Sequence, residues 1–328
     1  QQKLPRTCPQ KEDKRMFVKM HTGKTKSMNR RKFVETTFTL IGAAPLTGLA
    51  LPTKKFKPVQ FGIITDMHYA ERSPMNNRYY TESLIKVREC VDLMNEQQVD
   101  FLIELGDLKD EGNPPVEADT LRFLSNIEHE LKRFKGPLYH VLGNHDHDSI
   151  SKQQFLNGIS NFNFPKALNY YSFNKGSFHF VVLDANYTAD GKEYDHGNFD
   201  WKDAHIPAEQ LKWLKKDLKE HKMPTIVFVH QQLDAAAFNE SHKIYCPNNA
   251  EEARIIIEDS DRVIGVFQGH FHEGSLNTIN QIYYYTLKAV IEGSGPENNN
   301  YAIVEIGKDL VTHIKGFRKT ISQDVLKN

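Results

Sequence analysis

Cysteine is scarce in this chain, and its spacing excludes several kinds of site. The 328 residues include three cysteines, Cys8, Cys90 and Cys246, and no C-x-x-C pair. Zinc-finger and thioredoxin-like proteins are excluded because both need closely spaced cysteines. Cys90 lies in a helical pattern, where we expect a small core side chain. Cys246 is expected to be a free, inert thiol, and a Cys90–Cys246 disulfide is the alternative.

The sequence also lacks the turn that presents a nucleophilic serine. It contains no G-x-S-x-G segment, and neither Cys90 nor Cys246 has a histidine or metal-ligand pattern around it. A serine or cysteine hydrolase is therefore excluded.

A short apolar segment near the N-terminus has the features of an export signal. It covers residues 38–49 and falls well short of the roughly 20 residues that cross a bilayer, so we expect no stable membrane span. Arg30 and Arg31 precede it, and the small residues Gly48 and Ala50 stand at its end, as in signal peptides. The paired arginines resemble a twin-arginine signal.

This N-terminal part divides into three expected segments. Residues 1–27 are polar, basic and aperiodic, which predicts a disordered extension. Residues 28–50 form the signal-like segment, and residues 51–58 form a linker. We expect translation to start at Met28 and the protein to be exported to the periplasm or the exterior. An ordinary N-terminal helix is the alternative for the apolar segment.

The formal net charge of zero conceals an asymmetry. The first 58 residues hold 14 Lys and Arg against 3 Asp and Glu, which leaves 28 basic and 39 acidic residues in the body of the chain. Such a body does not favour a nucleic acid polymer as partner, because phosphate backbones need clustered Lys and Arg. An anionic substrate would have to be attracted by bound cations.

Strands and helices alternate through the first half of the body. We expect strands at 59–65, 100–105 and 138–142, because each is a short apolar run that ends at Asp or Gly. Helices are expected at 78–97 and 116–134, and apolar residues recur in the first at spacings of three and four. Apolar strands separated by amphipathic helices imply a parallel sheet covered on both faces.

A second run of elements follows the first. Two such runs that each build a sheet predict a four-layer α/β/β/α sandwich, with two mixed sheets flanked by helices. No repeat or boundary divides residues 59–318, so we expect one domain there and a tail at 319–328. Further helices are expected from Pro207 and at 249–258. Further strands are expected at 170–173, 178–183, 225–229, 262–268, 282–287, 301–306 and 310–314. The last three of these strands are expected to be antiparallel.

Five short blocks place oxygen or nitrogen donors directly after apolar strands. The carboxyl ends of strands are where open α/β sheets bind ligands, so these distant blocks should converge. Glycines at 106, 143 and 269 allow sharp turns beside the donors. Asp66-Met67-His68 alone is uninformative and the block from Gly143 is more specific, but it is the ordered set that is not a chance arrangement. The blocks are Asp66-Met67-His68, Gly106-Asp107, Gly143-Asn144-His145-Asp146, His230 and Gly269-His270-Phe271-His272.

Seven of these side chains can hold two metal ions side by side. Carboxylate, amide and imidazole donors without thiolate suit manganese, iron, zinc or magnesium. Two ions about 3.5–4 Å apart would share a water whose pKa falls toward about 7, and the resulting hydroxide could attack phosphorus. We therefore expect a metal-dependent hydrolase of phosphate esters. One ion is assigned Asp66, His68 and His272, the other Asn144, His230 and His270, and Asp107 bridges them.

His145 is kept apart from the ligands. Because it adjoins Asn144, it can reach the phosphoryl oxygen or the leaving group and donate a proton. Asp146 is expected to orient and charge His145. Five further histidines of the body lack this context and are expected to be structural or solvated, and the two residues after Asp146 are expected to be bystanders: His129, His140, His179, His205 and His313, and then His147 and Asp148.

With these residues, the chain resembles the calcineurin-like metallophosphoesterases. In that family the D-x-H, G-D, G-N-H-D/E, H and G-H-x-H blocks are the ligands of a dinuclear metal centre, which agrees with the roles assigned above. The resemblance covers residues 59–318 and implies a phosphoesterase. A non-catalytic binding protein on the same scaffold is the alternative. Such a protein should have lost Asp107 or His270, and both are present.

Further segments are similar to the manganese-dependent ADP-ribose/CDP-alcohol diphosphatase group. That group implies cleavage of a phosphoanhydride, so a nucleotide diphosphate is the alternative to a simpler ester. Its members often carry Gln where this chain has His68, and the imidazole restores the ligand set of simpler phosphatases and phosphodiesterases. The similar segments are Ile64 to Ala70, Arg78-Tyr79-Tyr80, Ser83-Leu84, Ile206-Pro207, Gln210 to Leu214 and Val290-Ile291-Glu292-Gly293.

Four side chains near the blocks are candidate substrate contacts, namely Tyr69, Asn77, Arg78 and Gln231. Arg78 could hold a second phosphate through two parallel hydrogen bonds, and a solvated helix start is the alternative for it. The loop from 186 to 203 could form one wall of the pocket. The sequence makes no prediction of the oligomeric state.

Overall fold

A computed structural model describes residues 55–166 and 168–326. The predicted extension at 1–27, the signal-like segment at 28–50 and the first residues of the linker lie outside these residues. Within the described residues, no helix is both long and apolar enough to cross a membrane.

The first sheet contains the strands that carry the first three blocks. β1, β2 and β3 run parallel, because α1 (Ser83–Gln97) and α2 (Glu117–Leu131) provide the crossovers between them. β10, β11 and β12 continue the sheet antiparallel on the other side of β1. In spatial order the strands are β12 (Gln323–Val325), β11 (Thr312–Arg318), β10 (Asn300–Ile306), β1 (Val59–Ile64), β2 (Phe101–Glu104) and β3 (Leu138–His140).

The second sheet carries the last two blocks. β5, β6, β7 and β9 are parallel, and β4 and β8 pair antiparallel at its two edges. The helices of this half are α4 (Ala208–Glu220), α5 (Ala235–Phe238) and α6 (Ala250–Glu258). The strands in spatial order are β4 (Tyr171–Lys175), β5 (Phe178–Val182), β6 (Thr225–Phe228), β7 (Val263–Gln268), β9 (Ile282–Thr286) and β8 (Ser275–Ile279).

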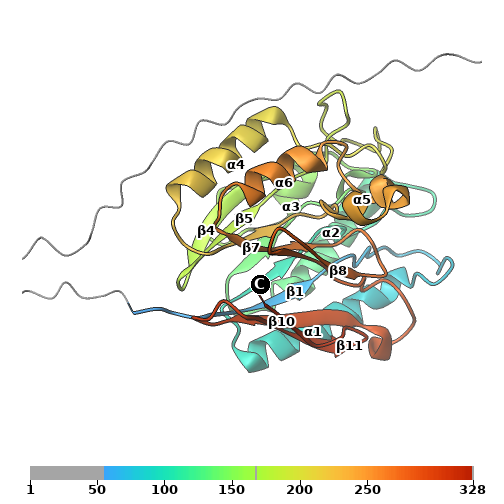
Figure 1. The fold of residues 1–328 in the computed structure, drawn as a ribbon. Helices are drawn as coiled ribbons and strands as arrows, with labels where there is room; N and C mark the ends of the chain where they lie inside the picture. The colour runs from blue at the N-terminus through green and yellow to red at the C-terminus, as the bar shows by residue number, and fades with distance from the viewer. Residues whose placement is uncertain (1–54, 167, 327–328) are drawn as a thin grey trace, which may run out of the picture. The chain divides into compact units, whose positions relative to one another are not determined.

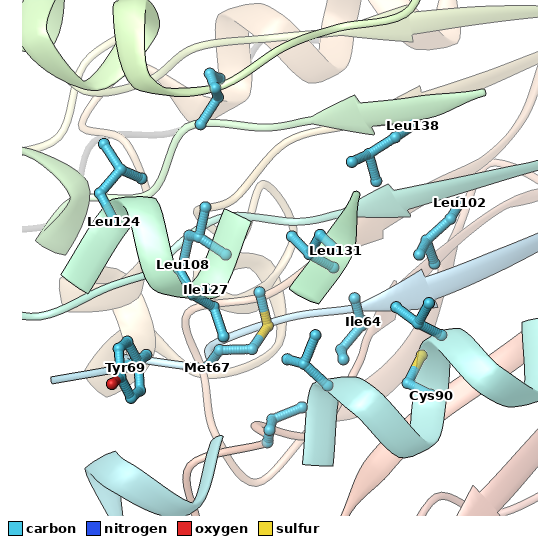
Figure 2. Close-up of a cluster of buried hydrophobic side chains, with 14 of the residues drawn as sticks. Ile64, Met67, Tyr69, Cys90, Leu102, Leu108, Leu124, Ile127, Leu131 and Leu138 are labelled. Atoms are coloured by element: carbon cyan, nitrogen blue, oxygen red, sulfur yellow. The ribbon is translucent and has the colours of Figure 1, made fainter. Parts of the chain in front are cut away.

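The two sheets face each other between two layers of helices (Figure 1), which confirms the predicted sandwich. The α1 and α2 helices pack on the outer face of the first sheet, where Met94 and Ile127 belong to one buried cluster with Leu102 (Figure 2). The α4 and α6 helices cover the second sheet, where Leu214 and Ile257 join a separate cluster.

Aromatic rings fill the space between the sheets. Phe61 of β1 stacks on Phe101 of β2 with ring centroids 4.8 Å apart, and its edges meet Phe180, Phe228 and Phe267 of the second sheet at 5.7 to 5.8 Å. Because strands on both sides of this core are buried on both faces, they read in sequence as continuous apolar runs.

Several predicted elements were displaced or missed. The strand expected at 282–287 is β9. It pairs antiparallel with β8, as predicted, but it pairs parallel with its other neighbour, β7. The tail predicted from 319 contains β12, which extends the first sheet. The short helix α3 (Lys152–Gly158) was not predicted, although Ser151 and Gln154 form a capping box at its start. Short 3-10 turns occur at η1 (Tyr80–Glu82), η2 (His145–His147), η3 (Glu240–Tyr245) and η4 (Pro296–Asn298).

The two described cysteines are buried and free, so the alternative of a disulfide between them is wrong. Burial raises the pKa of the Cys90 thiol above its ordinary range and that of Cys246 to about 11. Neither thiol is therefore a nucleophile at neutral pH.

Candidate metal centre

The predicted metal ligands meet where five strands end. Asp66 and His68 follow β1, Asp107 follows β2, and Asn144 follows β3, whereas His230 follows β6 and His270 and His272 follow β7. The carboxyl ends of parallel strands from both sheets thus open onto one site, as expected for α/β proteins.

The backbone at this site adopts conformations that most residues avoid. Asp66, His68, Asp107 and His270 have φ of 53°, 45°, 55° and 66°. Non-glycine residues in this left-handed region cost about 1–3 kcal/mol each, and such strain is characteristic of functional sites. The fold therefore accepts strain in order to aim four of the seven predicted ligands inward.

Gly143 is required by close packing of two of these turns. A Cβ atom at this position would lie 2.1 Å from the backbone nitrogen of Asp107 and 2.3 Å from its carboxylate. Any side chain would push the turn after β2 away from the turn after β3. The glycine thus permits Asp107 to reach the centre of the site.

The first group of side chains consists of Asp66, His68 and His272. Nε2 of His272 lies 3.5 Å from Oδ1 of Asp66, and Nε2 of His68 lies 3.7 Å from the same oxygen. The other oxygen of Asp66 accepts a hydrogen bond from Thr65 at 2.7 Å. One carboxylate oxygen and two ring nitrogens therefore face a common point.

The second group consists of Asp107, Asn144, His230 and His270. Oδ2 of Asp107 lies 3.2 Å from Nε2 of His230 and 3.5 Å from Nε2 of His68, so this oxygen stands between the two groups. Oδ1 of Asp107 is held by the backbone N–H of His145 at 2.8 Å. This is the position that a bridging carboxylate needs.

Three ligand atoms of the second group are buried without a hydrogen-bond partner among the described residues. They are Oδ1 of Asn144, Nε2 of His230 and Nε2 of His270. Buried polar atoms are nearly always satisfied, so unsatisfied ones that converge indicate a missing partner. Oxygen and nitrogen donors without thiolate fit manganese, iron, zinc or magnesium.

Neighbouring groups orient the ring nitrogens. Nδ1 of His230 donates to the Leu105 carbonyl at 2.8 Å, and Nδ1 of His272 donates to Oε1 of Glu292 at 2.7 Å. With Nδ1 protonated, Nε2 is the atom left free for a cation in each ring.

The charges of the site hold its carboxylates ionised. Burial would raise the pKa of Asp66, but the hydrogen bonds from His272 and His68 outweigh it and hold the pKa well below the ordinary range. The pKa of His270 falls to about 3 because of burial and the nearby charge of His230. His270 is therefore neutral, which is the state that binds a metal, whereas burial is outweighed by Asp107 at His230 and its pKa rises to about 9.

His145 lies beside the two groups and is partly exposed. Its side chain is 32% accessible, against 1% for that of His68, and the two rings meet edge to face at 4.7 Å. Nδ1 of His145 lies 3.4 Å from Oδ1 of Asp110. Burial opposes its charge, but Asp110 and Asp107 outweigh that effect and raise the pKa of His145 to about 10.

The predicted role of Asp146 in orienting His145 is wrong. Its carboxylate instead accepts hydrogen bonds from the backbone N–H groups of Leu108 at 2.9 Å and Gly143 at 2.8 Å, and weaker ones from Asp107 and Lys109. Asp146 therefore joins the turns after β2 and β3. Burial first, then the charge of Asp107, raises its pKa to about 7.

The structure buries the predicted substrate contacts Tyr69 and Gln231, and neither lines a cleft beside the metal ligands. Tyr69 is 3% exposed, belongs to the buried cluster under α1 and α2 (Figure 2), and packs edge-on against Phe123. Gln231 is fully buried and donates to Oδ1 of Asn186 at 2.8 Å. Both directly follow a predicted ligand in sequence. Successive side chains point to opposite sides of the backbone there, so these two point into the interior.

Asn77 and Arg78 do line the cleft beside the metal ligands. This cleft has a volume of about 910 Å³, and His270 and His272 form part of its wall. Glu292 accepts a hydrogen bond from Asn77 at 2.9 Å and lies 3.7 Å from Nε of Arg78. A smaller cleft of about 460 Å³ is also lined by Arg78 and reaches His145.

Residues 186–203 contribute to the wall as expected. Trp201 lines the smaller cleft, and its ring meets that of His270 at 5.7 Å and that of Tyr245 at 5.7 Å. Tyr245 in turn lies 4.9 Å from Phe271. These aromatic rings at the mouth were not singled out from the sequence.

Asp110 and Glu292 were also missed as partners of the site. Asp110 lies only three residues after Asp107, so the G-D block itself carried a signal for it. Glu292 is 20 residues from His272, and its segment reaches the site only because it follows β9, the neighbour of β7. Local spacing therefore did not indicate Glu292.

Comparisons with known proteins agree with this geometry. The family model described as calcineurin-like phosphoesterase matches residues 59–274. A manganese-dependent ADP-ribose/CDP-alcohol diphosphatase of Arabidopsis thaliana is 24% identical over 71% of this chain and 86% of its own length. A 3',5'-cyclic-nucleotide phosphodiesterase of Nostoc sp. is 24% identical over 69% of this chain and 76% of its own length.

A solved structure shares the fold. The dimetal phosphatase from Danio rerio superposes with a TM-score of 0.70 at 22% identity, and the match covers 83% of this chain and 100% of that one. The family model spans well over half of the chain, and the range that it matches contains the residues that converge here. The chain therefore belongs to the calcineurin-like phosphoesterase family and is a metal-dependent phosphoric ester hydrolase.

Proposed function

We propose that the protein hydrolyses a phosphoanhydride of the ADP-ribose or CDP-alcohol type. The observation that carries this proposal is the cleft of about 910 Å³ that begins at His270 and His272 and continues past Arg78. A cleft of this size leaves room for groups on the far side of the phosphate that is attacked. Relatives at 24% and 25% identity are named as diphosphatases with such substrates.

The ligand assignment is part of the proposal. Asp66, His68 and His272 hold one metal ion, and Asn144, His230 and His270 hold the other, with Oδ2 of Asp107 shared between them. Support comes from the convergence of Asp66 with His272 and of Asp107 with His230 and His270. Two bound ions supply an activated water and neutralise charge on the phosphoryl oxygens.

The protein's own residues position the substrate and move a proton. His145 is oriented through Nδ1 by Asp110, and it lines the smaller cleft beside the metal ligands. It is therefore placed to donate a proton to the departing group. Arg78 borders both clefts and can contact the phosphoryl group once it is released from Glu292.

A cyclic-nucleotide phosphodiesterase is the second candidate. His68 favours it, because the diphosphatase group often carries Gln there, and here Nε2 of His68 lies within 3.7 Å of Asp66 and 3.5 Å of Asp107. The Nostoc relative carries that activity in its name. The two candidates differ in the bond that is broken, an anhydride or a cyclic diester.

A substrate panel separates the two candidates. The purified protein would be loaded in turn with manganese, iron, zinc or magnesium and assayed with ADP-ribose, a CDP-alcohol, a 3',5'-cyclic nucleotide and p-nitrophenyl phosphate. We expect the highest kcat/KM with ADP-ribose or the CDP-alcohol. Faster hydrolysis of the cyclic nucleotide would reject the anhydride proposal in favour of the diesterase.

We also propose that the protein is exported. The support is the paired arginines at 30 and 31 ahead of a short apolar segment. N-terminal sequencing of the protein from a cell's periplasm or medium should give a start near residue 51. Recovery of residues 1–27 on exported material would reject the proposed start at Met28.

A further inference from the structure

One arm of the larger cleft carries an excess of positive charge. Lys288 and Lys319 both line the cleft, and neither has an ion-pair partner among residues 55–166 and 168–326. The charge of Glu292 is shared among Arg78, Asn77 and His272. Glu273 is the remaining acidic residue of this cleft, so the arm has an excess of one positive charge.

Hydrogen bonds connect the backbone at both lysines to the metal centre. The N–H of Ala289, next to Lys288, donates to the carbonyl of His272 at 3.1 Å. Asn300 holds the carbonyl of Ala289 at 2.8 Å, and the N–H of Lys319 donates to the carbonyl of Asn299 at 3.1 Å. The backbone positions of the two lysines are thereby tied to the turn that carries His272.

We propose that Lys288 and Lys319 bind a second phosphate, adjacent to the one attacked at the metal centre. The inference rests on the proposed function and deepens it, because it names the feature that makes a diphosphate a better substrate than a monoester. Arg78 is the less suitable group for this phosphate, since Glu292 already occupies its guanidinium side. A lysine without a partner can bind phosphate with no such competition.

The subsite fits hydrolysis of the anhydride bond. Water oxygen bonds to the phosphorus at the metal centre, and the bond from that phosphorus to the bridging oxygen breaks. The departing phosphate keeps the bridging oxygen and its electron pair and takes a proton from His145. The attacking water gives up one proton, which restores that of His145, and the products are two monophosphates. Before and after this step, the second phosphate carries negative charge that the two lysines can contact.

The test measures binding and does not depend on turnover. The full chain loaded with manganese is titrated calorimetrically with α,β-methylene-ADP, which has two phosphorus groups, and with AMP, which has one. We expect the unaltered protein to prefer the first ligand. The Lys288→Gln/Lys319→Gln variant should lose about tenfold of that preference, because two partly exposed contacts together contribute on the order of a factor of ten.

Control variants distinguish the effect of removing the lysine charges from an effect of unfolding. Lys308→Gln removes an exposed lysine outside the cleft and should leave the preference unchanged. Lys288→Arg/Lys319→Arg should retain most of it. Equal weakening of both ligands in the glutamine variant, or no preference in the unaltered protein, would overturn the subsite. Failure to hydrolyse ADP-ribose, with the preference present and lost in the variant, would reject the proposed substrate and leave the subsite standing.

Discussion

The Nε2 atoms of His68 and His272 lie 3.2 Å apart, although 204 residues separate them in the chain. Each ring also approaches Oδ1 of Asp66, at 3.7 and 3.5 Å. Two ring nitrogens and a carboxylate oxygen at this spacing compete for the same protons, so the arrangement is costly without a positive charge at its centre. A cation bound there offsets the cost and explains why the fold brings the three residues together.

Replacement of Glu292 should weaken metal binding. Its carboxylate holds Nδ1 of His272 at 2.7 Å, and loss of such an orienting group typically costs about 10–100-fold in metal affinity or activity. Glu292→Gln is therefore expected to raise the metal Kd by that factor in a chelator competition. Glu305→Gln, on the exposed side of β10, is the matched control. An unchanged Kd for Glu292→Gln would refute the orienting role.

Replacement of His145 should affect substrates according to their leaving group. If His145 protonates the departing oxygen, His145→Gln should slow an alkyl phosphate about 10²–10⁴-fold and p-nitrophenyl phosphate far less, because nitrophenolate leaves without a proton. The comparison uses kcat/KM for both esters, with the exposed His129→Gln as control. Equal losses on the two esters would assign His145 a binding role instead.

Bound metal should stabilise the fold. A ligand at 100 times its Kd adds about 2.7 kcal/mol to the free energy of unfolding. For a domain of this size that corresponds to a rise in Tm of roughly 5–10 °C, which scanning calorimetry with and without manganese would detect. Asp107→Asn, which alters the oxygen between the two groups, should lose most of this rise and most of the activity while still folding. A full manganese effect in that variant would contradict the bridging position.

The acid stability of the fold should depend on Asp217. Burial would raise the pKa of Asp217, but hydrogen bonds from His179 at 2.6 Å and Ser172 at 2.8 Å outweigh it and lower the pKa below 3.8. A lowered carboxyl pKa contributes stability above the unfolded-state value and loses it as pH falls through the folded value. Asp217→Asn should therefore flatten the loss of stability below about pH 4.

Denaturant titrations between pH 2 and 6 measure this dependence. The variant is expected to lose about 1–3 kcal/mol near neutral pH, the usual cost of leaving a buried partner unsatisfied, and less at pH 2. Asp259→Asn removes an exposed carboxylate on the same half of the molecule and serves as control. If the free energy of unfolding falls as steeply with decreasing pH in Asp217→Asn as in the unaltered protein, Asp217 is not the source of that loss.

The sequence predicted the convergence of the metal groups because strand ends are local features. Asp66, Asp107 and His230 each follow an apolar run, and parallel strands place such ends at one edge. The sandwich followed from the same alternation of strands and helices. These parts of the fold depend on hydrophobic periodicity and on the residues that end each strand, and both are present in a single sequence.

Tertiary relationships decided what the sequence could not predict. Tyr69 and Gln231 adjoin ligands in sequence, yet the turns send both side chains into the interior. Asp146 was assigned to its neighbour His145 but instead binds the backbone N–H of Leu108 in another loop and that of Gly143 in its own. Pairing of β12 with β11 depends on a sheet edge that no local pattern marks.

The metal content of the active enzyme tests the central claim most directly. Elemental analysis of purified, active protein should find about two transition-metal or alkaline-earth ions per chain, as a two-metal site requires. Activity should fall with metal content on dialysis against a chelator and return when metal is added. Full activity in protein that holds no stoichiometric metal would contradict the account.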